Sequence, residues 1–402
     1  MHNLWTLYKY EVKKLTGKKL LWVTAFLCVV AIVIAAFAGL IGTYYVDGKP
    51  IESNYEAFQK DQAYQKELSG RCIDQGLLQE TVDGYSRVPT NVLRYSLTEE
   101  YETFARPYSE IFHLIRTWTG MDLSSIQHWE ADETALYEAR SQNSESNWQS
   151  IPLAETEKEF WRNKESQIDT PLTYYYHKGY ENILDSFSPV GILMLLFVAI
   201  CLSNLFADEH IRRTDQLVLS SIAGKETVYW AKILAGVTVS MIAATMMTFL
   251  TMVLNLGYYG AEGFGMQFQA CFSTYSYPIT IGQACLIAYG VLIVTSILAA
   301  VFVMVISELF RSGIVALAIS AGLIILGNVI RIPTQYRVIA QIWDWSPMAY
   351  LSTWNVFDPR TLILFGQCFT SWQVVPVVYI LLSVVLAFVG KHIYQQYQVS
   401  GR

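Results

Sequence analysis

Long apolar runs recur along the chain and are separated by polar segments. A helix needs roughly 18 apolar residues to cross about 30 Å of hydrocarbon, because only internally hydrogen-bonded backbone is stable without water. Six runs meet that length: residues 20–42, 187–206, 232–256, 283–306, 313–330 and 373–390. The pattern predicts an all-α polytopic membrane protein with six transmembrane helices. The third run begins with Lys232, whose ammonium group we expect in water at the membrane interface.

Lysine and arginine are divided unequally between the two sides of such a bundle. Cytoplasmic loops carry an excess of these residues. One side, which includes both termini and the loop after the second span, holds 12 of them, whereas the short loops 257–282 and 331–372 on the other side hold 3. The bias predicts a multi-pass protein of the cell membrane with the N-terminal segment 1–19 and the tail 391–402 in the cytoplasm.

The N-terminal segment is amphipathic. Over residues 2–16, apolar side chains including Leu4 and Leu7 share one helical face, and Lys9 and Lys13 lie opposite. We expect a helix along the inner membrane surface. Lysines, an apolar run and the small residues of Ala36-Phe37-Ala38 also resemble a cleaved signal peptide, but the long basic segment and the long run favour a span.

The segment 43–186, between the first and second spans, is long enough to be a domain of its own, and the topology places it outside the cytoplasm. It contains 13 Lys and Arg against 25 Asp and Glu. Aromatic and aliphatic residues recur at three- and four-residue spacing from Tyr101 to Trp118, which predicts a helix that Pro107 kinks or splits. A second helix is expected over about 51–80. The domain is therefore predicted to be large and mainly helical.

Local signals refine this domain. Ser96 with Glu99 and Thr156 with Glu159 have capping-box spacing, which predicts helix starts there. Residues 141–150 (SQNSESNWQS) are small and polar, so they predict a flexible loop.

A second aromatic segment precedes the last span. Residues 342–357 (IWDWSPMAYLSTWNVF) are rich in tryptophan and tyrosine, which favour the membrane interface. The segment predicts short interfacial or re-entrant helices.

Composition and motifs exclude several function classes. Apolar residues make up 53% of the chain and charged residues 15%, as expected for a membrane protein. The sequence has no GxxxxGK[ST], HExxH or GxSxG motif and no CxxC or Cys/His metal spacing, so we expect no catalytic, cofactor or metal site and no nucleic-acid partner. The spans contain few ionisable residues, which argues against ion-coupled transport and for an external energy source.

The loop after the second span carries a distinct pattern. Asp208 and Glu209 suit the start of a helix, where carboxylates interact with free backbone N–H groups. On the helix that follows, apolar and polar side chains separate into two faces. The apolar face holds Ile211, Leu217, Val218 and Ile222, and the polar face holds Arg212, Arg213, Gln216 and Ser220. The pattern predicts a short amphipathic helix at 208–222 that presents a basic face to a soluble partner.

These residues resemble a known family. Phe206, Glu209, Thr214, Leu217 and Ser220, followed by Lys232, are similar to the intracellular loop of ABC-2 type permeases, the membrane subunits of ATP-binding-cassette exporters. The resemblance extends to the amphipathic N-terminus, the six spans and the aromatic segment before the last span. The sequence departs from the family at Arg213, where a glycine is usual.

The resemblance implies a function and a set of partners. In that family the loop acts as a coupling helix on a separate ATPase subunit, and two permeases, identical or different, pair in the bilayer. It implies that Glu209 anchors the helix and that Arg212, Arg213, Thr214, Leu217 and Ser220 form the ATPase-coupling surface. The region 187–390 would then hold transmembrane helices 2–6 of a transport permease without its own ATPase site. The alternative is a membrane-anchored sensor or scaffold whose acidic outward domain binds a peptide or protein partner.

Overall fold

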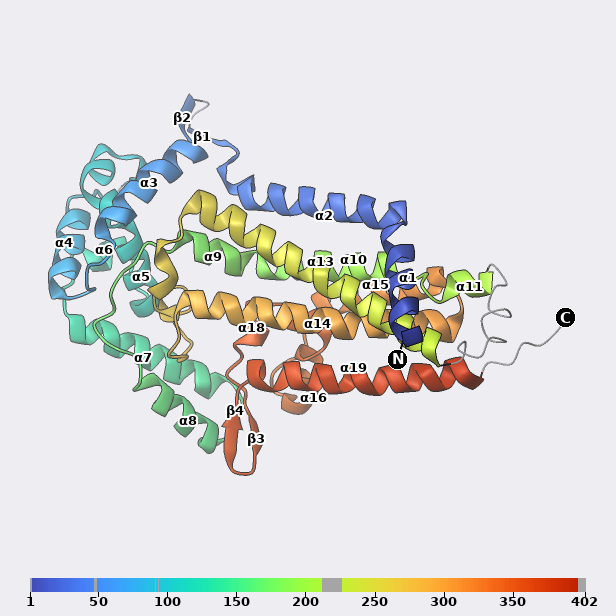
Figure 1. The fold of residues 1–402 in the computed structure, drawn as a ribbon. Coiled ribbons are helices and arrows are strands. Elements are labelled where there is room, and N and C mark those ends of the chain that lie inside the picture. The colour runs from blue at the N-terminus through green and yellow to red at the C-terminus, as the bar shows by residue number, and fades with distance from the viewer. Residues whose placement is uncertain (1, 47–48, 91, 93, 212–225, 397–402) are drawn as a thin grey trace. The chain divides into compact units, whose positions relative to one another are not determined.

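The computed structural model describes residues 2–46, 49–90, 92, 94–211 and 226–396. Figure 1 shows the fold of the chain. It forms two compact units. The first unit comprises Met1–Ile34, Asp185–Val253 and Ile287–Arg402, and the second comprises Ala35–Leu184 and Leu254–Leu286.

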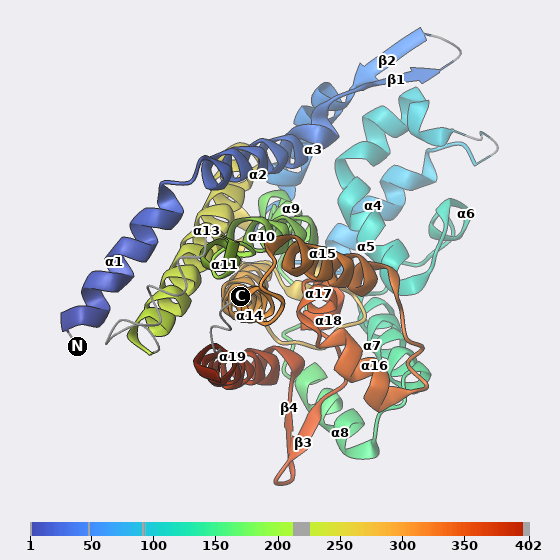
Figure 2. The same ribbon diagram turned by 90° about the vertical axis from the view of Figure 1, so that its right-hand side faces the viewer.

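The first unit is a bundle of long apolar helices. Its main helices are α1 (His2–Thr16), α2 (Lys19–Phe37), α10 (Phe187–Leu202), α11 (Ala207–Ile211), α13 (Thr227–Tyr259), α14 (Ile281–Phe310), α15 (Gly313–Val329) and α19 (Ser371–Gln396). Helices α10 and α14 are the most buried, whereas α2 and α19 expose most of their apolar side chains. In the end-on view of Figure 2, α10 and α14 accordingly lie in the middle of this bundle.

Five helices of the described chain are long and apolar enough to cross a membrane. They coincide with five of the six predicted runs. The sixth run, 313–330, forms α15, which has 17 residues. At about 1.5 Å per residue such a helix reaches about 25 Å, which is short of about 30 Å of hydrocarbon.

Small residues explain how α15 packs. Its buried stripe contains Gly313, Ala316, Ser320 and Gly327. A Cβ atom on Gly327 would lie 2.4 Å from the Cβ of Met348, so only glycine allows this approach. Small residues at such spacing let helix backbones pack closely where hydrophobicity provides no driving force.

Short elements connect α15 to α19. They are α16 (Arg337–Asp344), α17 (Pro347–Tyr350), α18 (Thr353–Val356), β3 (Leu362–Leu364) and β4 (Gln367–Phe369). The short helices predicted within 342–357 are therefore present. The antiparallel hairpin of β3 and β4 was not predicted.

The second unit is mainly helical. Its helices are α3 (Asn54–Leu68), α4 (Gln75–Ser86), α5 (Ser109–Thr119), α6 (Leu123–Ile126), α7 (Glu133–Ser150), α8 (Glu155–Glu165) and α9 (Lys178–Asp185), the last ending at the unit boundary. A hairpin of β1 (Thr43–Val46) and β2 (Lys49–Ser53) precedes them. Single turns of 3₁₀ helix occur at η1 (Ala38–Leu40), η2 (Tyr95–Leu97), η4 (Arg106–Tyr108), η5 (Glu262–Gly265) and η6 (Phe268–Ala270), and η3 (Tyr101–Ala105) is a π-helix. Buried aromatic residues form the core of the second unit, among them Tyr85, Phe112, Trp118 and Trp161.

Pro107 has the predicted effect. The predicted helix from Tyr101 to Trp118 is split into the π-turn η3, the 3₁₀ turn η4 and the α-helix α5. Proline cannot donate a backbone hydrogen bond within a helix, so the α-helix begins only after it. The expected helix over 51–80 is likewise divided, into β2, α3 and α4.

The expected loop at 141–150 is wrong, because these residues form the second half of α7. Arg140, Ser144 and Trp148 are buried along one face of this helix. The Arg140 guanidinium pairs with the Glu165 carboxylate of α8. Ser144 and Trp148 of this segment are therefore internal, whereas its other polar residues are exposed or half-buried on the outer face of a helix.

Both predicted capping boxes are wrong in detail. Thr98, not Ser96, accepts a hydrogen bond from the backbone N–H of Tyr101 at 3.2 Å. At the start of α8, the Glu157 carboxylate accepts a hydrogen bond from the Ala154 backbone N–H at 2.8 Å. Helix α8 thus begins at Glu155, ahead of the predicted cap Thr156.

Residues 254–286 belong to the second unit, although the sequence suggested only a short loop for most of them. The Tyr277 ring contacts the Trp161 ring edge-on at 4.7 Å between centroids. The Ser276 hydroxyl donates to the Glu165 carboxylate at 2.5 Å. Aromatic residues and serines in this loop are the signal that it packs against α8.

Candidate functional site

The described part of the predicted coupling helix is α11. Helix α10 ends at Leu202, and after a short turn α11 covers Ala207–Ile211. Glu209 lies within it. The other predicted coupling residues, Arg212, Arg213, Thr214, Leu217 and Ser220, lie outside the described residues. The geometry of the site is therefore that of the start of this segment and its neighbours.

Glu209 is nearly buried and contacts two lysines. Its carboxylate lies 2.6 Å from the Lys232 ammonium of α13 and 3.5 Å from the Lys14 ammonium of α1. Only 9% of the residue is exposed. Glu209 thus joins α11 to two other helices of the same unit.

Lys232 does not place its ammonium in water, so this prediction is wrong. The residue is fully buried by protein. Its ammonium lies 3.2 Å from the Glu11 carboxylate of α1, in addition to Glu209, and 5.6 Å from the centre of the Phe206 ring. Two carboxylates and an aromatic face therefore replace the water that the charge would otherwise require.

Glu11 is the site residue that the sequence prediction missed. It is the only acidic residue between His2 and Lys19, in a segment with several lysines. A single carboxylate in a basic helix has no obvious role on an anionic membrane surface. Its presence among lysines was therefore the sequence feature that could have indicated a buried ion pair. In the structure it supplies half of the carboxylate environment of Lys232.

One more ion pair completes the arrangement. Lys18, just after α1, lies 2.7 Å from the Asp208 carboxylate. We call Glu11, Lys14, Lys18, Asp208, Glu209 and Lys232 the α11 cluster. Its three carboxylates balance its three ammonium groups. The carboxylates of α11 are thus paired with Lys14 of α1, with Lys18 between α1 and α2, and with Lys232 of α13.

The helix end before α11 is fixed by aromatic rings. Phe206 lies 5.6 Å from the ring of Tyr229 in α13 and 5.8 Å from the ring of Tyr394 in α19. The Tyr229 hydroxyl donates to the backbone carbonyl of Ala387 at 2.6 Å. These contacts connect α11 to the end of the last helix.

Helix α14 contacts the other side of α11. The His210 ring nitrogen Nε2 lies 3.2 Å from the buried Glu308 carboxylate. The backbone N–H of Ala207 donates to the Ser307 hydroxyl at 3.3 Å, and that hydroxyl donates to the Ser203 carbonyl. These bonds attach α11 to α14 in addition to α1 and α13.

Comparison with known protein families identifies the chain. The family described as ABC-2 family transporter protein matches residues 5–366, which include the whole of the second unit and most of the first, up to the turn before β4. The chain belongs to the ABC-2 transporter family. A search of curated proteins finds no match. This ABC-2 protein is therefore a membrane transport permease, and members of its family carry no ATPase site of their own.

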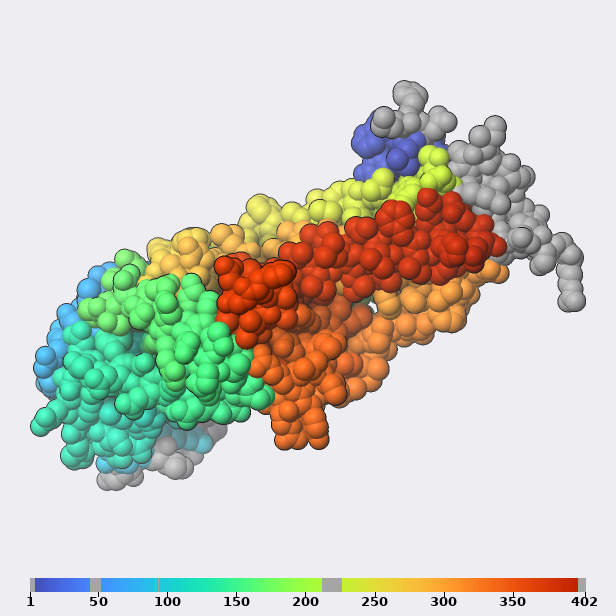
Figure 3. Space-filling model, turned by 90° about the horizontal axis from the view of Figure 1, so that it is seen from below, coloured from blue at the N-terminus to red at the C-terminus, as the bar shows by residue number. Residues whose placement is uncertain are grey.

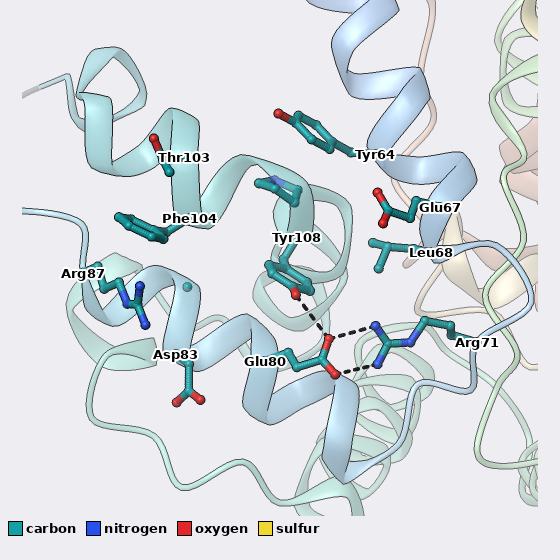
Figure 4. A pocket seen from close by; sticks show the side chains of 12 residues that line it. Tyr64, Glu67, Leu68, Arg71, Glu80, Asp83, Arg87, Thr103, Phe104 and Tyr108 are labelled. Carbon is teal, nitrogen blue, oxygen red and sulfur yellow. Dashed lines mark hydrogen bonds and ion pairs between the residues drawn. The ribbon is translucent and has the colours of Figure 1, made fainter.

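The second unit of this ABC-2 permease contains a polar cavity of about 460 Å³. Figure 4 shows how Tyr64, Phe104 and Tyr108 surround it. Arg71 binds Glu80 through two hydrogen bonds of 2.8 Å, and the Tyr108 hydroxyl donates to the same carboxylate at 3.2 Å.

The charges in this cavity perturb each other. The hydrogen bonds from Arg71 lower the pKa of Glu80, against a smaller opposing effect of burial. Burial and then the Glu80 charge raise the pKa of Tyr108. Glu80 is therefore held as the carboxylate that pairs with Arg71, and Tyr108 is held as the neutral phenol that donates to Glu80.

No metal centre is found among the residues that the structure describes, since none of their His, Cys, Asp and Glu side chains forms a group of three that could hold an ion. His113 and His128 are exposed, and the Nδ1 atom of His177 lies 2.8 Å from the Tyr175 carbonyl.

Proposed function

We propose that this permease is the membrane subunit of an ATP-driven exporter and that it couples to a separate ATP-binding-cassette subunit through the loop after its second span. Arg212, Arg213, Thr214, Leu217 and Ser220 would form the surface that meets the ATPase. The α11 cluster is the observation that supports this proposal. It ties the start of the loop to several helices at once, which a segment that transmits movement requires.

The charges of the cluster suit a mechanical role. Apart from the pair of Lys14 with Glu11 within α1, each ion pair of the cluster joins residues far apart in the chain, as in Glu11 with Lys232 and Lys18 with Asp208. Displacement of α11 would separate buried opposite charges unless α1 and α13 moved with it. Separating such pairs is costly in a low-dielectric environment, so the helices are expected to move as one body.

The proposed topology has six spans. The five long helices alone would leave the termini on opposite sides of the membrane, whereas the lysine and arginine bias favours both in the cytoplasm. We therefore assign α15 as the sixth span. Its short apolar length is compatible with a locally thinner bilayer or with flanking side chains that extend to the interface. This topology places residues 43–186 outside the cytoplasm as an extracytoplasmic domain.

The absence of a nucleotide-binding motif from the sequence supports a separate ATPase partner. The sequence contains no phosphate-binding GxxxxGK[ST] loop, so the energy of transport must come from another subunit. Exposed apolar side chains on α2 and α19, such as Phe26 and Phe388, are available to lipid and to a second permease. We propose a pair of permeases, identical or different, with a pair of ATPases.

The decisive experiment measures assembly and coupled ATP turnover. The chain is purified in lipid nanodiscs together with a candidate ATP-binding-cassette ATPase subunit. Reversal of both charges in Arg212→Glu/Arg213→Glu should weaken binding of the ATPase and increase the salt sensitivity of assembly, because charges at the edge of an interface mainly control association. Glu209→Ala should keep the ATPase bound but reduce the stimulation of its turnover.

Lys13→Glu is the matched control. It changes a cytoplasmic charge on an exposed position of α1 outside the cluster. It should leave assembly and turnover near those of the unmodified protein. If the double reversal behaves like this control, the loop is not the ATPase contact. Association with a kinase instead of an ATPase would favour the sensor alternative.

A further inference from the structure

The hairpin of β3 and β4 ends in an unusual turn. Leu364 pairs with Gln367, so Phe365 and Gly366 form a two-residue loop. Their φ angles are 52° and 78°, as a type I′ turn requires. Asparagine or aspartate usually occupies the first of these positions, and a bulky side chain there is strained. Phe365 is also fully exposed, at 104% of its reference area.

Exposed apolar side chains lie on both faces of the hairpin, although Gln367, which pairs with Leu364, is polar and also exposed. Neighbouring residues of a strand point to opposite faces, so Ile363 and Leu364 lie on different sides. Both are exposed, at 41% and 44%. A protein partner that packed on one face would leave the other in water. Exposure on both faces and at the tip indicates an apolar environment that surrounds the hairpin.

The hairpin is continuous with the last span. No Asp, Glu, Lys, Arg or His occurs from Thr361 to Gly390, which includes the hairpin and most of α19. The last charged residue before this stretch, Arg360, is buried and paired with Asp358 and with Asp344 at 2.6 Å. In Figure 1 the hairpin protrudes sideways from the first turn of α19, across the axis of that helix. A hairpin in this place lies along the membrane surface rather than away from it.

Helix α16 adds a second apolar surface in the same unit. Val338, Ile339 and Ile342 are each at least 60% exposed, on one side of the helix. Figure 3 views the molecule from the side on which the hairpin and α16 emerge, and both reach that face. The Trp343 indole N–H is bonded to the Ile330 carbonyl at 3.1 Å, so α16 is fixed to the end of α15.

We infer that Phe365, its hairpin and the apolar face of α16 form a lipid anchor that inserts into the outer leaflet of the bilayer. The strained turn holds the phenyl ring at the tip, where it enters the boundary between headgroups and acyl chains. Because the hairpin carries no charge, its insertion requires no anionic headgroup and does not depend on salt. The assignment to the outer leaflet rests on the proposed topology, but insertion itself does not rest on ATP coupling.

A fluorescent probe at residue 365 tests this inference. The full chain is reconstituted into vesicles of zwitterionic phosphatidylcholine after the three cysteines that are not buried, Cys72, Cys271 and Cys368, are replaced by serine. Phe365→Cys is then labelled with an environment-sensitive dye. We expect blue-shifted emission, loss of most of that emission to a nitroxide on the lipid acyl chain, and little quenching by a water-soluble quencher at low or high salt.

Glu138→Cys is the matched control, because this exposed residue lies on α7 in the second unit. Its dye should show the opposite quenching pattern. The cysteine-replaced protein without either change measures labelling of the buried thiols. If Phe365→Cys disturbs folding, Leu364→Cys repeats the test on the same hairpin.

Two results would overturn the inference. Emission from residue 365 that matches residue 138 would place the tip in water. Efficient cross-linking of two Phe365→Cys chains, with no lipid quenching, would show that a second copy covers the hairpin. ATP turnover is not part of either measurement, so loss of the coupling proposal would leave this result intact.

Discussion

Two buried cations, one in each unit, have similar partners but different surroundings. Lys232 is fully buried, and the carboxylates of Glu11 and Glu209 that face it are only slightly exposed. Arg106 is 5% exposed and pairs with Glu52, Asp61 and Glu102. The side chains of Asp61 and Glu102 are about 40% exposed, so water can solvate them without the arginine.

The chain positions of these partners differ as well. Arg106 is bonded to residues of β2, α3 and η3 within one compact unit, and its guanidinium donates further to the Ala57 carbonyl at 3.2 Å. Lys232 connects α1, α11 and α13, and its partner Glu11 lies more than two hundred positions away in the chain. The comparison suggests that Arg106 stabilises a local fold, whereas Lys232 links the movements of separate helices.

Lys232→Met should have the largest effect. It removes the ammonium and leaves the Glu11 and Glu209 carboxylates buried without their main counter-charge, which costs about 3–5 kcal/mol. We expect a large decrease in the thermal unfolding temperature of the purified chain and loss of ATPase stimulation. Fluorescence-detected size-exclusion chromatography after heating measures the first, and turnover in nanodiscs the second.

A compensated variant separates stability from coupling. Glu11→Gln/Glu209→Gln/Lys232→Met contains no uncompensated charge at these positions and should recover much of the lost stability, because neutral buried groups are tolerated. It should still fail to stimulate the ATPase. Lys391→Gln is the control, since its pair with the largely exposed Glu226 is worth less than about 1 kcal/mol. Normal stimulation of the ATPase by the compensated variant would contradict the proposed mechanical role of the α11 cluster.

Arg106→Lys should have an intermediate effect, confined to the second unit. A lysine keeps the charge but cannot supply the separate N–H donors that Asp61, Glu102 and Ala57 receive. Loss of these charged hydrogen bonds is expected to cost about 1–3 kcal/mol. Limited proteolysis should cut the second unit earlier, while ATPase stimulation stays unchanged.

Arg162→Lys is the matched control for this change. Its guanidinium also binds a carboxylate through two nitrogen atoms, that of Glu145, but the pair is exposed. Its loss should have little effect on proteolysis. Equal effects of the two substitutions would mean that burial does not distinguish them, and impaired ATPase stimulation by Arg106→Lys would contradict the division of roles between the two cations.

The spans were predictable because membrane length is a strong constraint on composition. The helices of the second unit were harder to predict, because some of them bury polar residues. Residues 141–150 looked like a loop since Ser144 and its neighbours are polar, and Arg140 before them is charged. The burial of Arg140 depends on its pair with Glu165, which lies on another helix and cannot be located from local periodicity. The hairpin before α19 was missed for another reason, since its strands are only three residues long.

The family could be predicted from a short pattern, but the contacts of Glu209 could not. Lys232 was expected in water because a lysine at the end of a span usually extends there. Its burial depends on Glu11, more than two hundred residues earlier in the chain. Pairing of this kind is set by tertiary structure, and a single sequence contains no direct measure of it.

The ion pair of Glu80 with Arg71 is more exposed than those of Lys232 and Arg106, since 43% of the Glu80 side chain is in solvent. We expect its contribution to stability to be the smallest of the three. Arg71 lowers its pKa in the folded protein relative to the ordinary value of 4.5. A carboxyl group whose pKa is lower in the folded than in the unfolded protein stabilises the fold at pH values above its unfolded pKa. This contribution disappears as the pH falls through the pKa of the folded protein. Glu80→Gln should therefore reduce stability at neutral pH by less than about 1 kcal/mol and make the unfolding temperature less dependent on pH below the ordinary pKa of 4.5. Glu138→Gln, at an exposed position on α7, should leave the pH profile unchanged. A profile for Glu80→Gln that runs parallel to that of the unmodified protein would mean that solvent already screens the Arg71 pair, and that burial is needed before such a pair affects stability.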